Sequence, residues 1–290
     1  MNSLFLREEF AMKNKLFWLI LILGMIAIVF SLVKGPSEES VEFKPLELNV
    51  GDEFTQIEYA QPMYVLNYMI KDVTGDGTND MIIVIGEKEK VDDLFANKID
   101  LVIYEPNESR FYPLKLKNMN GEMPKIETYD LTGDNILDII LTVNDTNGNV
   151  AVRIASRVEE DFKEILKAKD NKGIVFSGQF TDGFKANVKN SQYAKEATLD
   201  LANRKENYVT NGFYDESGRL LKPDSKIMTS NFVSIEFVQL DGYYGIQTVQ
   251  RILGFNSEDL LDEITTIWKY ENGKWSAKEA KGNVIGNILY

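Results

Sequence analysis

The sequence predicts a mainly β domain preceded by one N-terminal transmembrane helix. Three observations indicate this fold class. An uncharged apolar segment lies close to the N-terminus. The rest of the chain consists of short runs rich in Ile, Val, Tyr and Phe, separated by Gly, Asn and Asp turns, which is typical of strands. An Asp-rich turn sequence also occurs twice before similar apolar runs, which indicates repeated β units.

The N-terminal segment is the first element. Residues 16–33 form eighteen positions without a charge, and at about 1.5 Å per residue they span most of a bilayer's hydrocarbon core. The run exceeds the ~7–15 residues of a cleavable signal and lacks an A-x-A site, so we interpret it as an uncleaved signal-anchor. A cleaved signal and a buried helix are the alternatives. Arg7, Lys13 and Lys15 favour a cytoplasmic N-terminus. The predicted parts are a cytoplasmic N-terminus (1–15), the signal-anchor (16–33), a polar linker (34–45) and an extracytoplasmic domain (46–290).

The repeat organises the exported domain. Residues 71–83 read KDVTGDGTNDMII, and residues 129–141 read YDLTGDNILDIIL, an offset of 58 residues. A worn third copy is predicted at 238–249, and residues 173–188 show the pattern of apolar run, turn and apolar run without the acidic loop. We therefore predict four related sheets of three or four strands, two of which carry a complete acidic loop. Short helices are expected near residues 90–95 and 257–261.

Each complete copy places side-chain oxygens at positions 1, 3, 5 and 9 of a nine-residue loop. Calcium takes about six to eight oxygen ligands, and a loop with this spacing can wrap around one ion. Position 7 would contribute its backbone carbonyl, and Gly77 or Asn135 would make the sharp turn at position 6. An EF-hand is excluded because position 12 is Ile83 or Leu141 instead of Glu, and because strands follow. The predicted calcium ligands are Asp72, Thr74, Asp76, Thr78 and Asp80 in the first copy and Asp130, Thr132, Asp134, Ile136 and Asp138 in the second.

The alternative interpretation is that these are Asp/Gly turns without a metal, since Asp readily bonds its own backbone. The same four ligand positions in two copies favour calcium.

The pattern D-x-T-G-D-G-x-x-D followed by an apolar strand resembles the FG-GAP (VCBS-type) repeat, the calcium-loop blade of integrin-like β-propellers. The anchor-plus-repeat layout is similar to uncharacterised repeat proteins of Gram-positive bacteria. This resemblance implies one calcium ion in each complete loop, held by the ten residues named above. Such propellers often have about seven blades, whereas this chain has room for about four. The resemblance therefore implies a small or incomplete propeller, or closure through a homo-oligomer.

Composition limits the function. The net charge of −13 argues against nucleic acid, whose phosphates are bound by an excess of Lys and Arg. The absence of cysteine excludes disulfides and thiolate metal sites. The absence of histidine excludes Ser-His-Asp catalysis and nearly every zinc site. No P-loop, G-x-S-x-G or H-E-x-x-H signature is present.

We therefore expect no enzyme, and a glycan hydrolase is the least favoured class. The leading hypothesis is a membrane-anchored, calcium-stabilised module that binds a protein or cell-envelope ligand. The alternative is a structural or assembly scaffold of the envelope, with residues 212–221 as a candidate contact. Five aromatic residues are candidate ligand anchors, although their strand context favours core or cross-strand positions. They are Tyr243, Tyr244, Trp268, Tyr270 and Trp275.

Overall fold

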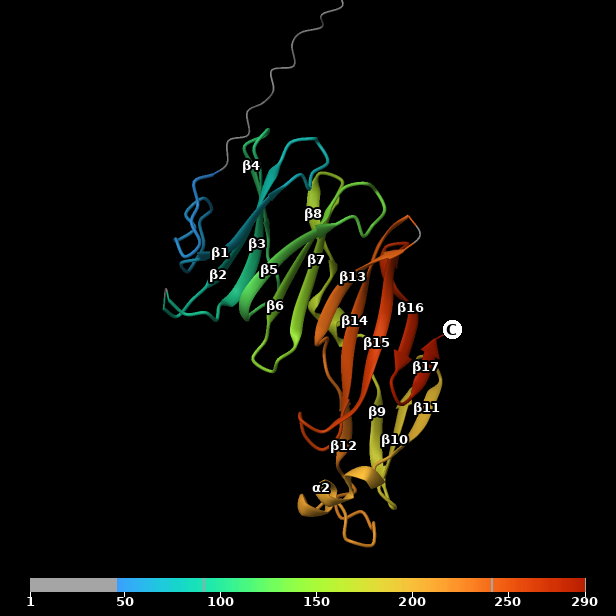
Figure 1. Ribbon diagram of the computed structural model, residues 1–290. Coiled ribbons are helices and arrows are strands. Elements are labelled where there is room, and N and C mark those ends of the chain that lie inside the picture. The colour runs from blue at the N-terminus through green and yellow to red at the C-terminus, as the bar shows by residue number, and fades with distance from the viewer. Residues whose placement is uncertain (1–45, 91, 241, 290) are drawn as a thin grey trace, which may run out of the picture. The chain divides into compact units, whose positions relative to one another are not determined.

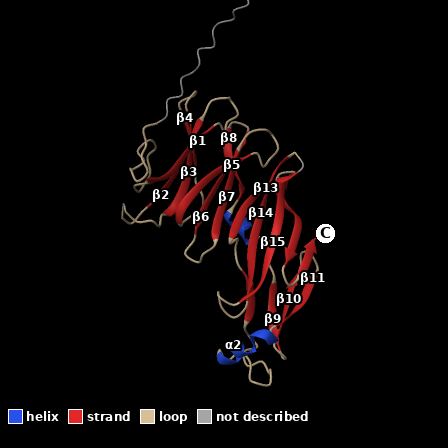
Figure 2. Cartoon of the chain, in the orientation of Figure 1, coloured by secondary structure: helices blue, strands red, loops and turns tan. Residues whose placement is uncertain are grey.

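The computed structural model describes residues 46–90, 92–240 and 242–289, all of which belong to one compact unit. Strands dominate this part of the chain (Figure 2). Its helical elements are short: the α-helix α2 (Lys205–Thr210) and the 3-10 helices η1 (Ala168–Lys172) and η2 (Ala202–Arg204). The prediction of a mainly β domain is confirmed. The predicted helices at 90–95 and 257–261 are wrong, because the described residues of the first are turns, bends or irregular, and the second is a turn that leads into a strand at Leu260.

The predicted anchor and linker lie outside the described residues. Within the part of the chain that the structure describes, no helix is both long and apolar enough to span a bilayer.

The first two sheets repeat one architecture, a four-stranded antiparallel meander (Figure 1). In each sheet the second strand is almost wholly buried, because it carries an unbroken apolar run and is covered on both faces. The first sheet contains β1 (Tyr64–Lys71), β2 (Asp80–Glu87), β3 (Asn97–Glu105) and β4 (Arg110–Leu114). The second contains β5 (Glu122–Tyr129), β6 (Asp138–Asn144), β7 (Val150–Val158) and β8 (Asp161–Leu166). The repeat seen in the sequence is therefore a repeat of whole sheets.

These two sheets pack face to face. One core contains Ile82 and Leu101 from the first sheet together with Ile139 and Leu141 from the second. The first strands of the two sheets, β1 and β5, are in contact, as are the last strands, β4 and β8. The amide of Asn67 also donates to the carbonyl of Pro124 at 2.8 Å, which joins β1 to β5.

The other face of the first sheet is covered by the residues that precede it. Phe54 and Met63 are buried with Ile83 and Val102 in a separate core. Backbone hydrogen bonds from Gly51 N to Val65 O and from Phe54 N to Met63 O hold this segment against β1. The segment that precedes β1 thus covers the face of the first sheet that is turned away from the second sheet.

The third sheet has nine strands, and this corrects the prediction of four related sheets. Its order is β11-β10-β9-β12-β14-β15-β16-β17, with β13 also paired to β14. The described residues therefore form two repeat units and one larger sheet. The strands are β9 (Ser177–Thr181), β10 (Lys185–Asn190), β11 (Lys195–Asp200), β12 (Lys226–Thr229), β13 (Ser234–Leu240), β14 (Tyr243–Leu253), β15 (Leu260–Glu271), β16 (Lys274–Gly282) and β17 (Gly286–Leu289).

The worn third copy predicted at 238–249 lies in the hairpin formed by β13 and β14. The pairing runs from Ser234 with Val249 to Leu240 with Tyr243. Gly242 has φ of 88°, which suits such a tight connection. Gln239 and Gln247 therefore lie in paired strands, opposite Tyr244 and Glu236, and do not surround a loop.

The segment 212–221 is held to the third sheet by buried side chains. Phe213 and Tyr214 are buried in the core of the third sheet, and the Tyr214 hydroxyl donates to the carbonyls of Thr181 and Lys185 at 2.9 Å each. This arrangement makes the segment a part of the fold, with Leu221 as its exposed apolar residue.

Candidate metal-binding loops

Loop 1 (Asp72–Asp80) joins β1 to β2, and its carboxylates organise its backbone. Asp72 accepts hydrogen bonds from the amides of Gly75 at 2.7 Å and Gly77 at 3.0 Å. Asp76 Oδ1 accepts from the amide of Thr78 at 2.7 Å. Gly75 and Gly77 have φ of 79° and 85°, in the left-handed region that glycine adopts most readily. The aspartate and the two glycines of Asp-x-x-Gly-x-Gly therefore suit the turn itself.

Loop 2 (Asp130–Asp138) joins β5 to β6 and has the same hydrogen bonds. Asp130 accepts from the amides of Gly133 at 2.6 Å and Asn135 at 3.0 Å, and Asp134 accepts from Ile136 N at 2.9 Å. Asn135 has φ of 66°, so it takes the conformation that Gly77 has in loop 1. The equivalence predicted from spacing thus extends to the backbone.

The last aspartate of each loop is buried and holds the loop to its strand. Asp80 Oδ2 accepts from the amides of Val73 and Thr74 at 2.8 and 3.0 Å, and it is fully buried. Asp138 Oδ2 accepts from the corresponding amides of Leu131 and Thr132 at 2.7 and 3.0 Å.

Burial raises the pKa of both of these carboxyls from 3.8 to about 6. Backbone hydrogen bonds oppose the shift in both loops, and in loop 2 the hydroxyl of Ser156 opposes it most. The two buried carboxylates therefore carry a desolvation cost when ionised, which a nearby cation would offset.

Several oxygens in the loops are buried without a hydrogen-bond partner. The hydroxyls of Thr74 and Thr132, both at position 3, are in this state, as is Asp80 Oδ1. The Thr74 hydroxyl lies close enough to Asp80 to lower its pKa, but no hydrogen bond of good geometry satisfies it. Buried polar atoms are rarely left unpaired, and an ion or a water molecule is their usual partner.

The oxygen atoms that could bind calcium in each loop are of several kinds. Within the described residues, no three or more Asp and Glu side chains meet closely enough to hold a metal by themselves. A shell at either loop therefore requires the threonine hydroxyl and backbone carbonyls beside the carboxylates. Calcium accepts such all-oxygen shells. The structure thus places the ten predicted ligands in two matching loops, with their carboxylates already bonded to backbone amides.

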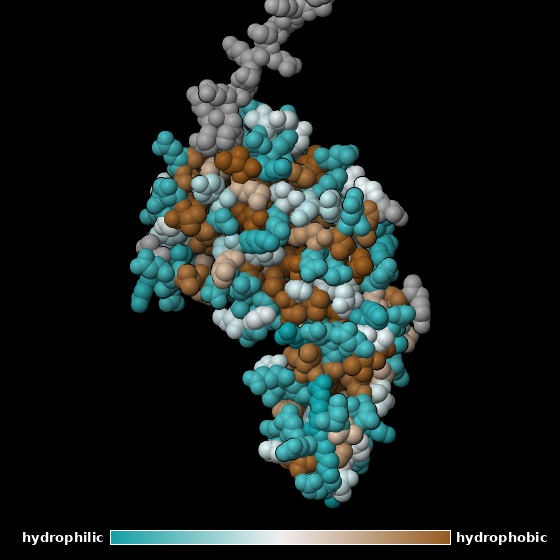
Figure 3. Space-filling model, viewed as in Figure 1, coloured by the Kyte–Doolittle hydropathy of each residue, from teal (hydrophilic) through white to brown (hydrophobic). Residues whose placement is uncertain are grey.

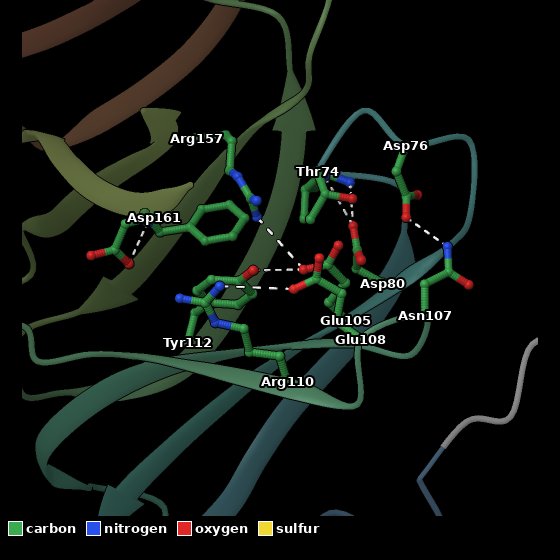
Figure 4. Close-up of polar contacts among 12 residues, drawn as sticks. Thr74, Asp76, Asp80, Glu105, Asn107, Glu108, Arg110, Tyr112, Arg157 and Asp161 are labelled. Atoms are coloured by element: carbon green, nitrogen blue, oxygen red, sulfur yellow. Dashed lines mark hydrogen bonds and ion pairs between the residues drawn. The ribbon is translucent and has the colours of Figure 1, made fainter. Parts of the chain in front are cut away.

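Asn107 is a site residue that the sequence analysis missed. It lies in the turn between β3 and β4, and its side-chain amide donates to Asp76 Oδ2 at 2.6 Å and to Thr78 Oγ1 at 2.8 Å. Figure 4 shows this amide directed at Asp76 from the neighbouring hairpin. The only signal in the sequence was a Pro106-Asn107 turn, and a turn residue 31 positions from Asp76 gives no indication of that contact.

The two loops also touch each other. A Cβ built on Gly75 would lie 2.9 Å from Cγ1 of Ile136, whereas one built on Gly133 would meet nothing within 4 Å. Ile136 at position 7 of loop 2 therefore packs over loop 1. This contact gives a packing role to the one predicted ligand position whose side chain has no oxygen.

A buried polar cluster lies beside loop 1. The Tyr112 hydroxyl donates to Glu105 Oε2 at 2.6 Å, and Nη1 of Arg157 lies 3.9 Å from the same oxygen (Figure 4). Arg157 comes from β7 and its guanidinium lies 5.0 Å from the centre of the Tyr112 ring. The cluster joins the first two sheets, because Glu105 and Tyr112 belong to β3 and β4. Burial raises the pKa of the Tyr112 hydroxyl, and its bond to Glu105 adds to the effect.

A polar groove of about 1150 Å³ lies on the strands β9, β10 and β11. Gln179, Asn187 and Thr198 contribute one side chain from each strand, and the segment 223–226 also lines it. The hydroxyl of Thr198 donates to Asn187 Oδ1 at 2.8 Å. Outside the loops, burial raises the pKa of Asp100 and Glu164, but neither residue lines this groove. The groove therefore offers amide and hydroxyl hydrogen-bonding groups from three neighbouring strands.

The predicted aromatic anchors are packing residues for the most part. Trp268 and Trp275 pack with Tyr244 against the second sheet, and their indole N–H groups donate to Thr248 Oγ1 and Ile165 O. Tyr270 is the cross-strand partner of Trp275. Lys269 lies 4.3 Å over the ring of Tyr243. The interpretation as core or cross-strand residues is confirmed for this group.

Comparisons with known proteins give one family match in the C-terminal part of the chain and longer matches to two individual proteins. Residues 174–282 match the family described as YybI C-terminal domain, which includes most of the third sheet and neither loop. The chain is 26% identical over 223 residues to the uncharacterised protein YybI of Bacillus subtilis (strain 168), covering 75% of this chain and 84% of that protein. A solved structure, exotype rhamnogalacturonan lyase YesX, is similar with a TM-score of 0.34 and 14% identity. That match covers 83% of this chain but only 36% of the lyase, and it is too weak to assign an activity.

Proposed function

We propose that this protein is a non-enzymatic binding module, anchored in the cell membrane by residues 16–33, with its β domain outside the cell. In this proposal the two meander sheets are FG-GAP-type blades of an open propeller, and loops 1 and 2 each bind a structural calcium ion. A protein or a cell-envelope polymer is the ligand.

One observation carries the calcium assignment. The position-3 hydroxyls, Thr74 and Thr132, are buried without a partner in both loops, next to carboxyls whose pKa burial raises to about 6. A cation would satisfy the hydroxyls and offset the desolvation of the carboxylates. Asp72, Asp76, Asp130 and Asp134 would complete the shells together with the backbone carbonyls of Thr78 and Ile136.

The test is thermal unfolding of the full chain in mild detergent, with EDTA and with about 1 mM calcium. We expect calcium to raise the melting temperature with saturation, because an ion that binds only the folded state stabilises it. The double variant Asp76→Ala/Asp134→Ala should lose that rise. If calcium leaves the wild-type melting temperature unchanged, the loops are Asp/Gly turns and the calcium assignment fails.

The groove on β9 to β11 is the ligand surface that we propose. Its side chains are mainly amides and hydroxyls, with charges of both signs from Lys189, Glu196 and Lys226, which suits a polar chain. When purified cell-wall polymer is sedimented, the wild type should be found in the pellet with the polymer. The variant Gln179→Ala/Asn187→Ala/Thr198→Ala should stay in the supernatant, because these exposed substitutions remove hydrogen bonds and leave the core intact.

An envelope assembly scaffold that associates with itself is the alternative function, and it needs a broad apolar contact surface. On the face shown in Figure 3, apolar residues are interspersed with polar ones. The most exposed large apolar side chains of the described residues are Leu94 in the β2–β3 connection, Met123 in β5 and Val284 in the β16–β17 connection, so they do not share one element. Sedimentation equilibrium separates the hypotheses, since a concentration-dependent dimer would favour the scaffold.

A further inference from the structure

Asn107 belongs to a different hairpin from loop 1, yet it reaches the free oxygens of that loop. Both hydrogens of its amide are used, one on Asp76 Oδ2 and one on Thr78 Oγ1. Asp72 is occupied by the amides of Gly75 and Gly77. Asn107 therefore lies at the side of the loop where side-chain oxygens remain without a backbone donor.

The chemistry of this position suits a cation. Two oxygens, from a carboxylate and a hydroxyl, converge on the Asn107 amide nitrogen within 2.8 Å. An asparagine amide is nearly symmetric in shape, so turning it over replaces its NH₂ group with its carbonyl oxygen. That oxygen is a good calcium ligand. Asp80 Oδ1, buried and without a hydrogen-bond partner in the same loop, independently points to a cation ligand in loop 1.

Loop 2 has no equivalent of Asn107 among the residues that the structure describes. Val158 pairs with Asp161, so the β7–β8 turn contains only Glu159 and Glu160, whereas four residues connect Glu105 to Arg110 in the β3–β4 turn. Among the described residues, the one hydrogen bond to the Asp134 carboxylate comes from Ile136 N. The two loops thus share a backbone and differ in what the neighbouring hairpin supplies.

We propose that the side-chain carbonyl of Asn107 is an additional ligand of the cation in loop 1, so that loop 1 binds calcium more tightly than loop 2. This inference rests on the proposed calcium function. Cation binding at loop 1 then also ties the β3–β4 hairpin to the β1–β2 connection.

Single-site proteins test the inference by isothermal titration with calcium. Asp134→Ala leaves loop 1 as the binding site, and Asp76→Ala leaves loop 2. In the Asp134→Ala background, Asn107→Ala should weaken calcium binding by about tenfold. In the Asp76→Ala background, the same substitution should change the affinity by less than about twofold. Asn107→Asp, which keeps an oxygen at this position, should bind calcium in loop 1 at least as tightly as the asparagine.

The outcomes separate the two proposals. If neither single-site protein binds calcium, the proposed function fails and this inference fails with it. If both bind but Asn107→Ala leaves loop 1 unchanged or tightens it, the proposed function stands and Asn107 is no ligand. Equal weakening of both sites would also overturn the inference, because it would reflect a general loss of stability. Circular dichroism in EDTA verifies that each variant is folded.

Discussion

Loop 1 and loop 2 have nearly the same backbone and different surroundings. In both, the first aspartate accepts from the amides at positions 4 and 6, and the last accepts from those at positions 2 and 3. Loop 1 additionally receives Asn107 from the next hairpin and carries Ile136 of loop 2 on its Gly75. The local sequence therefore sets the backbone conformation of such a loop, while neighbouring loops and hairpins decide which side chains surround it.

The largest effect is expected from removing the last aspartate of either loop. Asp80→Ala and Asp138→Ala each leave one buried and one partly buried amide without an acceptor, and the loss of a buried partner costs about 1–3 kcal/mol. We expect both variants to lower the free energy of unfolding by roughly 2–4 kcal/mol, measured by urea denaturation in EDTA. A large difference between the two variants in the free energy of unfolding would show that the last aspartate does not have the same structural role in both loops.

A smaller effect tests the contact between the loops. Gly75→Ala and Gly133→Ala both place a side chain at a positive φ, 79° and 80°, which costs about 1 kcal/mol. Only Gly75→Ala also meets Ile136, so it should cost about 1 kcal/mol more. The excess should disappear when Ile136→Ala is added. Equal costs for the two glycine variants would mean that the loops do not press on each other.

The stability of the folded protein should also depend on pH through the buried aspartate of each loop. Because burial raises the pKa of Asp80 from 3.8 to about 6, the folded state holds this proton more tightly than the unfolded state. The protonated Asp80 carboxyl therefore contributes stability that is fully present below pH 3.8 and is lost as the pH rises through about 6. In EDTA, wild type should lose stability relative to Asp80→Asn over this window, because asparagine stays neutral and still accepts the Val73 and Thr74 amides.

The Asp138→Asn variant should behave in the same way, because the pKa of Asp138 is also raised to about 6. With calcium at pH 7 the order should reverse in both loops, since the charged ligand is lost. Melting temperatures measured from pH 3.5 to 7 provide the readout. Parallel curves for wild type and variant in EDTA would contradict the raised pKa values.

The smallest effect is expected for Asn107→Ala without calcium. Asn107 is exposed, so its two hydrogen bonds compete with water, and their loss should change the free energy of unfolding by less than about 0.5 kcal/mol. The matched surface control is Asn147→Ala in the β6–β7 turn. A cost above about 1 kcal/mol for Asn107→Ala would assign this residue to the fold instead of the metal site.

The first two sheets were more predictable than the third. Their strands were visible as apolar runs, and the offset of 58 residues identified two equivalent turns, because the bonds that shape each turn join residues at most seven positions apart. The third sheet was misread as further repeat units, since pairing of β9 with β12 joins residues 47 and more positions apart, and no local pattern encodes it.

The sequence by itself determined the β class of the described domain and the conformation of the two acidic loops, because alternation, turn residues and Asp–amide bonds act over a few residues. Only the tertiary structure decided the number of sheets, the capping of the first sheet by Phe54 and Met63, and the approach of Asn107 to Asp76. These features depend on which faces and hairpins meet after the chain has folded. Such contacts are selected by burial and packing of distant segments, so they leave no periodic signal in the sequence.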